Sequence, residues 1–251
     1  AELFQEYPGY KTIYIDKKLK GKNCFKLPEL ETIEEYEEKL PEFKKLSLLR
    51  GKTIFILAGG GKVSGASLKL LEKLKHTEIT VLYIRPDPAL TPSDSILRDK
   101  VVFGILQEYA RSGLLKQFVF VENSKIESLL GDLSVLEYYK SINKVIVATL
   151  HMINFLLTAE NVFGKMTTTR EIDRISTIGI YDLEEQAENY LGNLTSPRQK
   201  IFLYAIKEED LTENKDLIRL IQQQVRSVYS GSELDISYKI TTTNYPSNFV
   251  Y

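Results

Sequence analysis

Short apolar runs alternate with longer amphipathic segments along most of the chain. Four runs rich in β-branched and aromatic residues predict buried strands, at residues 53–57, 78–84, 117–121 and 200–206. Segments with apolar residues at helical spacing lie between or after them, at residues 64–75, 93–111 and 212–229. This alternation predicts an α/β protein with a parallel sheet and right-handed crossovers.

The longest periodic segment, Ser134 to Leu157, predicts a single helix. At 1.5 Å per residue it would be about 36 Å long, enough to cross one domain and reach a second. A smaller unit follows, with strands expected at 174–180, 200–206, 234–242 and 248–251 and helices at 183–191 and 212–229. We therefore expect a first domain over residues 1–133, a central helix over 134–157 and a C-terminal domain over 158–251.

The region before the first buried strand predicts less regular structure. We expect the end of a helix at residues 1–7, a strand at 11–16, a helix from Thr32 to Leu40 and a helical piece at 41–49. Thr32 is a typical N-cap, and Glu35 three positions later completes a capping box.

Composition excludes several classes of function. The 251 residues carry a net charge of −1, which gives no field favouring nucleic acid or anionic membranes. Cys24 is the only cysteine and the two histidines lie far apart, so neither a cysteine metal cluster nor a histidine site is expected. The run from Val145 to Leu157 is too short and too polar to span a bilayer.

Three consecutive glycines, Gly59 to Gly61, follow the first buried strand and precede a helix. Glycine permits positive φ and close approach of a ligand, and a helix N-terminus attracts anions. Ser64 is the expected N-cap of this helix. The segment therefore predicts a phosphate site, with a tight strand-to-helix turn as the alternative. The motifs G-x-G-x-x-G and G-x-x-x-x-G-K-[ST] both fail here.

The loop from Gly59 to Gly65 resembles the signature G-G-G-T-G-S/T-G of the tubulin/FtsZ family. Five of the seven positions agree, while Lys62 and Val63 depart from it. The segment 121–126, VENSKI, is similar to the family's strand that ends in a guanine-binding asparagine. The long helix and the smaller unit after it resemble the family's central helix and activation domain. Several segments resemble those of short tubulin/FtsZ-like proteins encoded by large bacteriophages.

This resemblance implies a cytoplasmic protein, in the host cytoplasm if phage-encoded, that binds GTP or GDP with Mg²⁺. It further implies head-to-tail self-association into filaments, which is a heterologous contact. The family's first strand and first phosphate loop, which precede the first helix, do not occur in this sequence. We therefore expect that about a dozen or more N-terminal residues are missing from it.

The same resemblance assigns site residues, each with a plainer alternative. It places the phosphates on Gly59, Gly60, Gly61, Lys62, Ser64 and Gly65, guanine on Asn123 and Asn143 with Tyr139 stacked on it, and Mg²⁺ on Asp16 through water. Alternatively, Asn123 caps the helix from Lys125, Asn143 and Lys62 face solvent, Tyr139 belongs to the core and Asp16 caps its own loop. Arg98 either reaches the ribose or phosphates or lies exposed.

Catalysis is the least determined feature. In the family, acids after the central helix act on the nucleotide of the neighbouring subunit, within the motif N-x-D-x-x-D. This motif is absent here, and Glu171 and Asp173 are the catalytic candidates, or else solvated residues before a strand. A protein with the same fold that does not hydrolyse nucleotide, serving as a structural or adaptor protein, is the alternative function. An enzyme of Rossmann type acting on a small metabolite is disfavoured.

Overall fold

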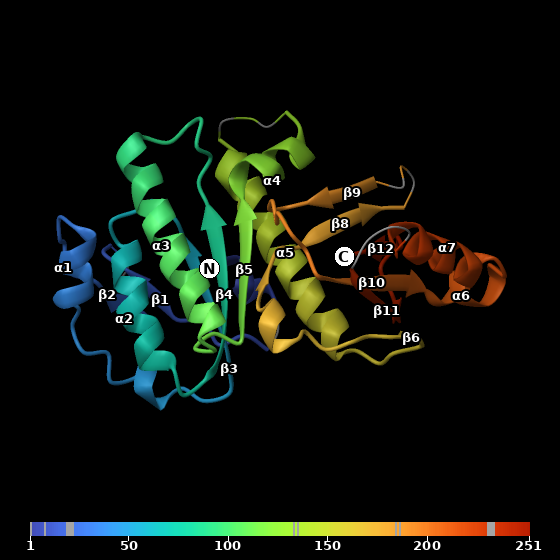
Figure 1. Cartoon of the computed structure of the whole chain (residues 1–251), viewed down its shortest axis with the longest axis horizontal. Coiled ribbons are helices and arrows are strands. Elements are labelled where there is room, and N and C mark those ends of the chain that lie inside the picture. The colour runs from blue at the N-terminus through green and yellow to red at the C-terminus, as the bar shows by residue number, and fades with distance from the viewer. Residues whose placement is uncertain are drawn as a thin grey trace.

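The computed structural model describes residues 2–7, 9–18, 23–132, 134, 136–183, 185, 187–229 and 234–251. The described strands form three sheets, of four, six and two strands. In Figure 1 the helices α2 and α3 lie on one side of the four-stranded sheet, and α5 lies between this sheet and the C-terminal part of the chain.

The four-stranded sheet is wholly parallel, as the alternation of strands and helices predicts. Its strands, in spatial order, are β3 (Lys52–Ala58), β4 (Glu78–Arg85), β5 (Gln117–Glu122) and β7 (Ile175–Ser176). The connecting helices are α2 (Ser64–Leu74) and α3 (Ser93–Arg111). The predicted bounds of α3 are correct.

Both faces of this sheet are covered, which explains why its central strands are almost continuously apolar. Val81, Tyr83 and Phe118 pack with α2 and α3, whereas Leu82 and Val119 pack on the other face. That second face is covered by α4 (Asn123–Leu130) and α5 (Tyr138–Thr158).

The six-stranded sheet is mixed, because only β10 and β11 pair in parallel. Its spatial order is β6 (Phe163–Lys165), β11 (Asp235–Thr243), β10 (Gln199–Lys207), β12 (Phe249–Val250), β8 (Gly179–Asp182) and β9 (Ala187–Tyr190). Alternate residues of β10 face opposite sides: Tyr204 packs with α7 (Leu217–Tyr229), and Leu203 packs with Leu156 of α5. The central helix is therefore shared by both sheets.

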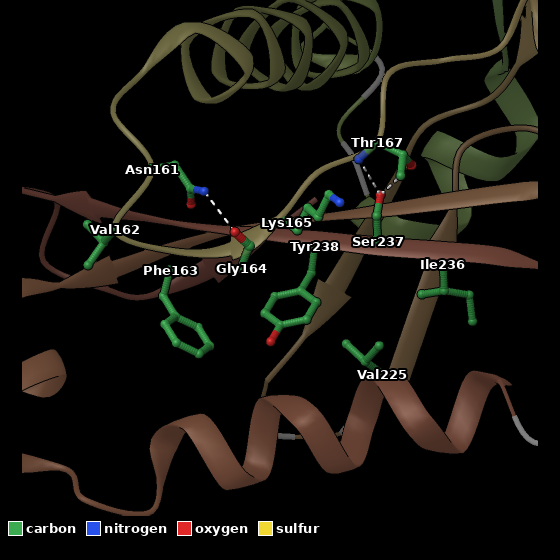
Figure 2. A pocket seen from close by; sticks show the side chains of 10 residues that line it. All are labelled: Asn161, Val162, Phe163, Gly164, Lys165, Thr167, Val225, Ile236, Ser237 and Tyr238. Carbon is green, nitrogen blue, oxygen red and sulfur yellow. Dashed lines mark hydrogen bonds between the residues drawn. The ribbon is translucent and has the colours of Figure 1, made fainter.

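A cavity of about 750 Å³ lies between α7 and the edge formed by β6 and β11. Figure 2 shows Phe163, Tyr238 and Val225 pointing into this space. A second cavity, of about 1140 Å³, lies between the four-stranded sheet, α5 and the C-terminal sheet.

The N-terminal part of the chain forms small elements beside the four-stranded sheet. They are the 3₁₀ helix η1 (Glu2–Glu6), β1 (Tyr14–Asp16), β2 (Cys24–Lys26), α1 (Ile33–Glu38) and the 3₁₀ helix η2 (Leu46–Leu48). The predicted cap of α1 is confirmed, because the Thr32 hydroxyl accepts a hydrogen bond from the Glu35 N–H at 3.2 Å.

Several element predictions are wrong. Residues 187–190 form the strand β9, not a helix, because pairing with β8 outweighs the helical spacing of Leu183, Ala187 and Leu191. The expected helix at 212–229 is two helices, α6 (Glu208–Glu213) and α7, and the piece at 41–49 is helical only in η2. α5 begins at Tyr138 instead of Ser134, and residues 133 and 135 lie outside the described residues.

The two sheets are joined beside the end of β5. Leu191, directly after β9, is fully buried in the core of the four-stranded sheet. Its carbonyl oxygen accepts a hydrogen bond from the Glu122 N–H at 2.7 Å, and its own N–H donates to Ile178 at 2.9 Å. Gly192 follows, and a Cβ atom there would lie 2.8 Å from the Phe120 carbonyl oxygen.

The central helix α5 is long and apolar enough to cross a membrane by length and composition alone. One face of this helix, however, enters the protein core: Ile142, Ile146 and Leu150 pack against the four-stranded sheet, and Leu156 packs against β10. The core helix of a globular protein meets the same length and composition criterion.

Candidate functional site

The ends of three parallel strands define one edge of the four-stranded sheet. The glycine loop follows β3, Arg85 is the last residue of β4, and Asn123 follows β5. Because parallel strands end at the same edge, these residues lie along one rim, where α/β sheets bind ligands. Figure 1 shows α3 and α4 beginning at this edge.

The glycine loop has the backbone that only glycine adopts readily. Gly60 has a φ of +79°, in the left-handed region. A Cβ atom at Gly59 would lie 2.5 Å from both the Tyr83 hydroxyl and an Asp99 carboxylate oxygen. The Gly60 carbonyl oxygen accepts a hydrogen bond from Nε of Arg98 at 2.9 Å. The loop is therefore held against α3 by its own backbone.

Consecutive N–H groups of this loop are available to a ligand. Within the described part of the chain, the N–H groups of Gly60, Gly61, Lys62 and Val63 donate to no protein acceptor. The space beside Gly61 is open, since a Cβ atom there would meet no atom within 4 Å. In a planar trans peptide the carbonyl and the following N–H point in opposite directions, so Arg98 also fixes the direction of the Gly61 N–H. Successive free N–H groups of this kind bind anions.

Ser64 and Gly65 have structural contacts of their own. Val63, not Ser64, occupies the N-cap position of α2, so the predicted cap is wrong: the Ser64 hydroxyl donates to the Gly61 carbonyl at 2.5 Å. The Ser64 and Gly65 N–H groups donate to Gly61 and Lys62 within the loop. Gly65 allows α2 to pack against α1, because a Cβ atom there would collide with the Ile33 carbonyl. Phosphate contact by these two residues stays a prediction.

The charged side chain of the loop has a partner. Lys62 does not extend freely into solvent, because its ammonium lies 2.7 Å from a carboxylate oxygen of Glu31, immediately before α1. Both side chains are exposed, at 43% for Lys62 and 79% for Glu31.

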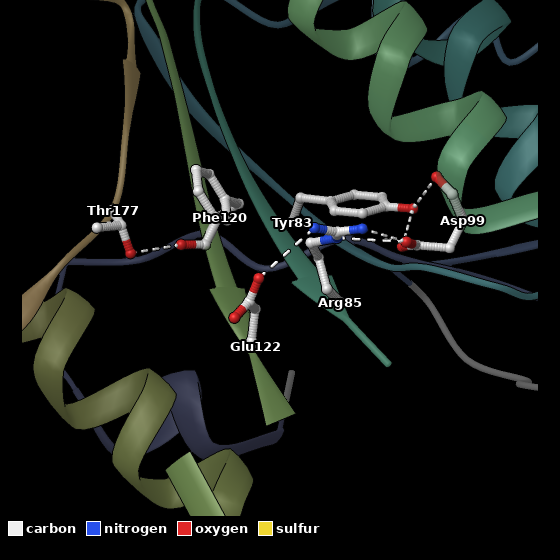
Figure 3. Close-up of polar contacts among 6 residues, drawn as sticks. All are labelled: Tyr83, Arg85, Asp99, Phe120, Glu122 and Thr177. Carbon is white, nitrogen blue, oxygen red and sulfur yellow. Dashed lines mark hydrogen bonds and ion pairs between the residues drawn. The ribbon is translucent and has the colours of Figure 1, made fainter. Parts of the chain in front are cut away.

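A buried polar network supports the rim from below (Figure 3). Arg85 binds Asp99 at 2.8 Å and approaches Glu122 at 3.5 Å, so it joins the ends of β4 and β5 to α3. The Tyr83 hydroxyl donates to the other oxygen of Asp99 at 3.0 Å. Burial, followed by the neighbouring Asp99, raises the pKa of Tyr83 far above its usual range. Tyr83 is thus a neutral donor that fixes Asp99.

The three residues predicted to hold the base differ in their surroundings. Oδ1 of Asn123 is buried and has no hydrogen-bond partner among the described residues, which leaves an acceptor free for a ligand. Tyr139 is 72% exposed, so its alternative as a core residue is wrong. Asn143 is exposed one turn further along α5. Tyr139 and Asn143 are therefore exposed on α5, whereas the amide oxygen of Asn123 is buried at the start of α4, and contact of all three with a base stays a prediction.

Asp16 belongs to a different sheet from the other site residues. It ends β1, which pairs only with β2 among the described strands, and its carboxylate accepts a hydrogen bond from the Lys18 N–H at 3.1 Å. This hydrogen bond agrees with the alternative prediction, in which Asp16 caps its own loop. Within the described ranges no three His, Cys, Asp or Glu side chains are grouped so that they could hold a metal ion. Contact of Asp16 with Mg²⁺ through water stays a prediction.

Glu171 and Asp173 lie at the opposite edge of the sheet from the glycine loop. They form the 3₁₀ helix η3 (Glu171–Asp173) before β7, whose first residue pairs with Phe118 near the start of β5. The six residues of β5 separate the two edges by roughly 16 Å. Asp173 binds Arg170 at 2.6 Å, and Glu171 approaches Arg174 at 3.6 Å. Neither acid can reach a ligand held by the glycine loop of the same chain.

Sequence reasoning missed the contacts between elements. The sequence offers ligand contact or exposure for Arg98, but its side chain is half-buried, binds the Gly60 carbonyl and also binds Ser95 at 2.7 Å. Arg85 and Asp99 carried no motif. Two features of the sequence could have identified this pair. Arg85 is a charged residue at the end of a buried strand, and Asp99 is an acid on the inward face of a helix. Neither cavity described above includes the glycine loop.

Comparison with known proteins places the fold. No protein-family model matches the sequence, and no curated protein sequence matches it. Among solved structures, an empty FtsZ dimer from M. jannaschii matches with a TM-score of 0.59, 13% identity and coverage of 78% of this chain and 60% of that one. An FtsZ mutant from the same organism matches with a TM-score of 0.53, 16% identity and coverage of 78% and 62%.

A third match is a GTPγS-form protofilament of TubZ from Bacillus thuringiensis serovar israelensis. Its TM-score is 0.55 at 13% identity, with coverage of 80% of this chain and 60% of that one. This chain thus spans about 60% of the length of the structures it matches. At these identities the likeness concerns the fold, and the chain has the tubulin/FtsZ fold that the sequence predicts: a parallel-sheet domain, a long central helix and a smaller α/β domain.

Proposed function

We propose that this protein binds a guanine nucleotide at the carboxyl edge of its four-stranded sheet and assembles head to tail into filaments. The observation that carries the proposal is the glycine loop, in which the N–H groups of Gly60, Gly61, Lys62 and Val63 have no acceptor in the described part of the protein and Gly61 faces open space. A polyphosphate fits this arrangement, because it accepts several hydrogen bonds and carries the charge that a helix N-terminus favours. The phosphates would also hold Mg²⁺, with Asp16 contributing through water.

The free acceptor of Asn123 supports guanine as the base. Its Oδ1 atom is buried without a partner, and a guanine edge offers N–H donors to such an oxygen. Tyr139 and Asn143, further along the same rim, would stack on the base and bind its edge. A buried acceptor left unpaired is costly, so a ligand that pairs it gains binding energy.

Exposed apolar residues at two opposite edges support head-to-tail contact. At the glycine-loop edge, Leu90, Leu97 and Leu136 are 73%, 64% and 93% exposed. At the other edge, Phe155 is 49% exposed and Ile172 is 71% exposed. Groups of exposed large apolar residues commonly mark protein contacts. Stacking one edge on the other would bury both and would bring η3 of one copy to the nucleotide of the next. Two of the matched structures are described as a dimer and a protofilament.

Hydrolysis would then be completed between copies, with Glu171 or Asp173 orienting water on the neighbour's nucleotide. The ion pairs of these acids with Arg174 and Arg170 favour a second candidate, a structural or adaptor protein of the same fold that binds nucleotide without turning it over. Steady-state phosphate release above the assembly concentration separates the two. Relatedness to phage-encoded tubulin-like proteins and residence in the cytoplasm belong to the same proposal.

Substitution of Gly61 tests the proposal. The backbone at Gly61 accepts other residues and the space beside it is open, so Gly61→Val should fold normally while its side chain occupies the anion site. We expect GTP and GDP binding, measured by calorimetry, to be lost, with an unchanged thermal unfolding midpoint. Gly104→Val, in α3 and equally unobstructed, is the matched control. Normal binding by Gly61→Val would reduce the loop to a turn.

A further inference from the structure

The salt bridge between Lys62 and Glu31 links the glycine loop to the segment before α1. The two residues are 31 positions apart, and their side-chain atoms meet at 2.7 Å. Lys62 is also one of the two positions at which the loop departs from the signature that it resembles. The bridge therefore joins the only cationic side chain of the loop to an acid from a separate element.

The backbone of Glu31 is held in place, and the side chain of Lys62 is long and exposed. The Glu31 N–H donates to a Glu35 carboxylate oxygen at 2.9 Å, and Glu35 is bound in turn by Lys39 at 2.7 Å. The start of α1 is fixed against α2, since Gly65 packs directly on Ile33. Lys62, by contrast, is an exposed flexible side chain following the left-handed Gly60 and the open Gly61.

The bridge places a carboxylate within reach of the same lysine that a bound anion would attract. Arg98, the cation of α3 that contacts the loop, already binds the Gly60 carbonyl and Ser95. An exposed salt bridge contributes little net stability, so Lys62 can exchange Glu31 for a more highly charged partner at small cost. The Lys62 hydrogen bond lowers the pKa of Glu31, which keeps this acid ionised and able to compete.

We propose that Glu31 holds Lys62 in the ligand-free protein as an internal substitute for phosphate, and that a bound polyphosphate takes Lys62 from it. Glu31 thus lowers the affinity for nucleotide, because it binds Lys62. Lys62 contacts the phosphates only after it leaves Glu31. This inference rests on the proposed function and names a regulatory contact at the same site.

Binding of GTPγS and of guanosine by variant proteins tests the proposal. Both side chains are exposed, so their substitution leaves the core untouched. Glu31→Gln should tighten GTPγS binding by about two- to fivefold, the range of an exposed salt bridge. Lys62→Met should weaken it, and the double variant should bind like Lys62→Met, because no lysine remains to be released. Guanosine, which has no phosphate, should bind all variants equally.

Glu34→Gln provides the matched control, because it removes the same charge from the first turn of α1. An equal gain from Glu34→Gln would show a general charge effect and overturn the proposal. Weaker GTPγS binding by Glu31→Gln, or no change in both single variants, would overturn it while the wild type still binds and the proposed function stands. A wild-type protein that binds no GTPγS would remove both.

Discussion

The ammonium of Lys239 lies 2.7 Å from the carbonyl oxygen of Leu156, 83 positions away in the last turn of α5. The same ammonium also donates to Leu157 and Ala159. The last carbonyls of a helix have no partners within the helix and favour a positive charge. Lys239, in β11 and only 5% exposed, therefore completes the end of the central helix from the other sheet.

Removal of this ammonium should destabilise the fold. Lys239→Met keeps the length of the side chain but leaves the carbonyls at the end of α5 without their donor. We expect a loss of about 1–3 kcal/mol in the free energy of unfolding, measured by urea denaturation. Lys165→Met, on the neighbouring exposed strand β6, should change it by less than about 0.5 kcal/mol. Equal losses in both variants would refute the capping role.

Asn123→Ala should weaken GTP binding without destabilising the fold. Because its Oδ1 atom has no hydrogen-bond partner among the residues that the structure describes, its removal should leave the free energy of unfolding unchanged or slightly higher. GTP affinity should fall by about 1–3 kcal/mol, because the base then loses a paired acceptor. Equilibrium titration with GTP and ATP measures this. Equal binding of ATP by the wild type, or unchanged GTP binding by the variant, would contradict the base assignment.

Turnover should depend on contact between copies. Dilute monomer should bind GTP and hydrolyse almost none, and phosphate release should rise more steeply than linearly with protein concentration. Glu171→Gln and Asp173→Asn should retain GTP binding, since η3 lies across the sheet from the glycine loop. Whichever acid is catalytic should abolish turnover and lengthen filament lifetime. A linear dependence on concentration with full activity in both variants would exclude the trans mechanism.

His151 should make stability depend on pH. Tyr7 stacks on its ring at 4.0 Å, and the Tyr10 hydroxyl lies 3.3 Å from Nδ1. Burial lowers the pKa of His151 below 6.5, so the folded state favours the neutral ring and the unfolded state binds the proton more readily. This contribution is present above about pH 6.5 and is lost as the pH falls below it.

Denaturant unfolding between pH 7.5 and about pH 5.5 checks this dependence on either side of the usual histidine pKa. His151→Gln should flatten the fall in the free energy of unfolding, whereas His76→Gln, at an exposed site, should follow the wild type. If the free energy of unfolding of His151→Gln falls with pH as steeply as that of the wild type, the pH dependence arises from other groups.

The parts of the fold that the sequence predicts are those fixed by local signals. β4 and β5 are recognisable because burial on both faces makes them continuously apolar. α3 is bounded by Pro92 before it and Gly113 after it, both of which favour a helix end. The strand β9 was not predicted, because its pairing with β8 is a tertiary contact. The single strand expected at 174–180 is two strands, β7 and β8, which belong to different sheets.

Some parts of the candidate site can also be predicted from local signals, and others depend on contacts between distant elements. The glycine loop can be predicted from the sequence, because three consecutive glycines after a strand indicate a turn locally. The partners of the loop, Glu31 and Arg98, come from elements that the fold brings together, and no local signal identifies them. The acids Glu171 and Asp173 could be named from their position after α5, but their distance from the glycine loop follows only from the parallel register of β5 and β7.

The hydrogen bond from the Glu122 N–H to the Leu191 carbonyl has a mechanical consequence. It anchors the C-terminal sheet to the residue next to Asn123. Gly192 packs so closely on the Phe120 backbone that a side chain there would collide with it. A bending or pulling force on the C-terminal half is therefore transmitted directly to the end of β5. Under the proposed function, in which Asn123 binds the base and copies assemble head to tail, tension along a filament would therefore change the affinity for nucleotide.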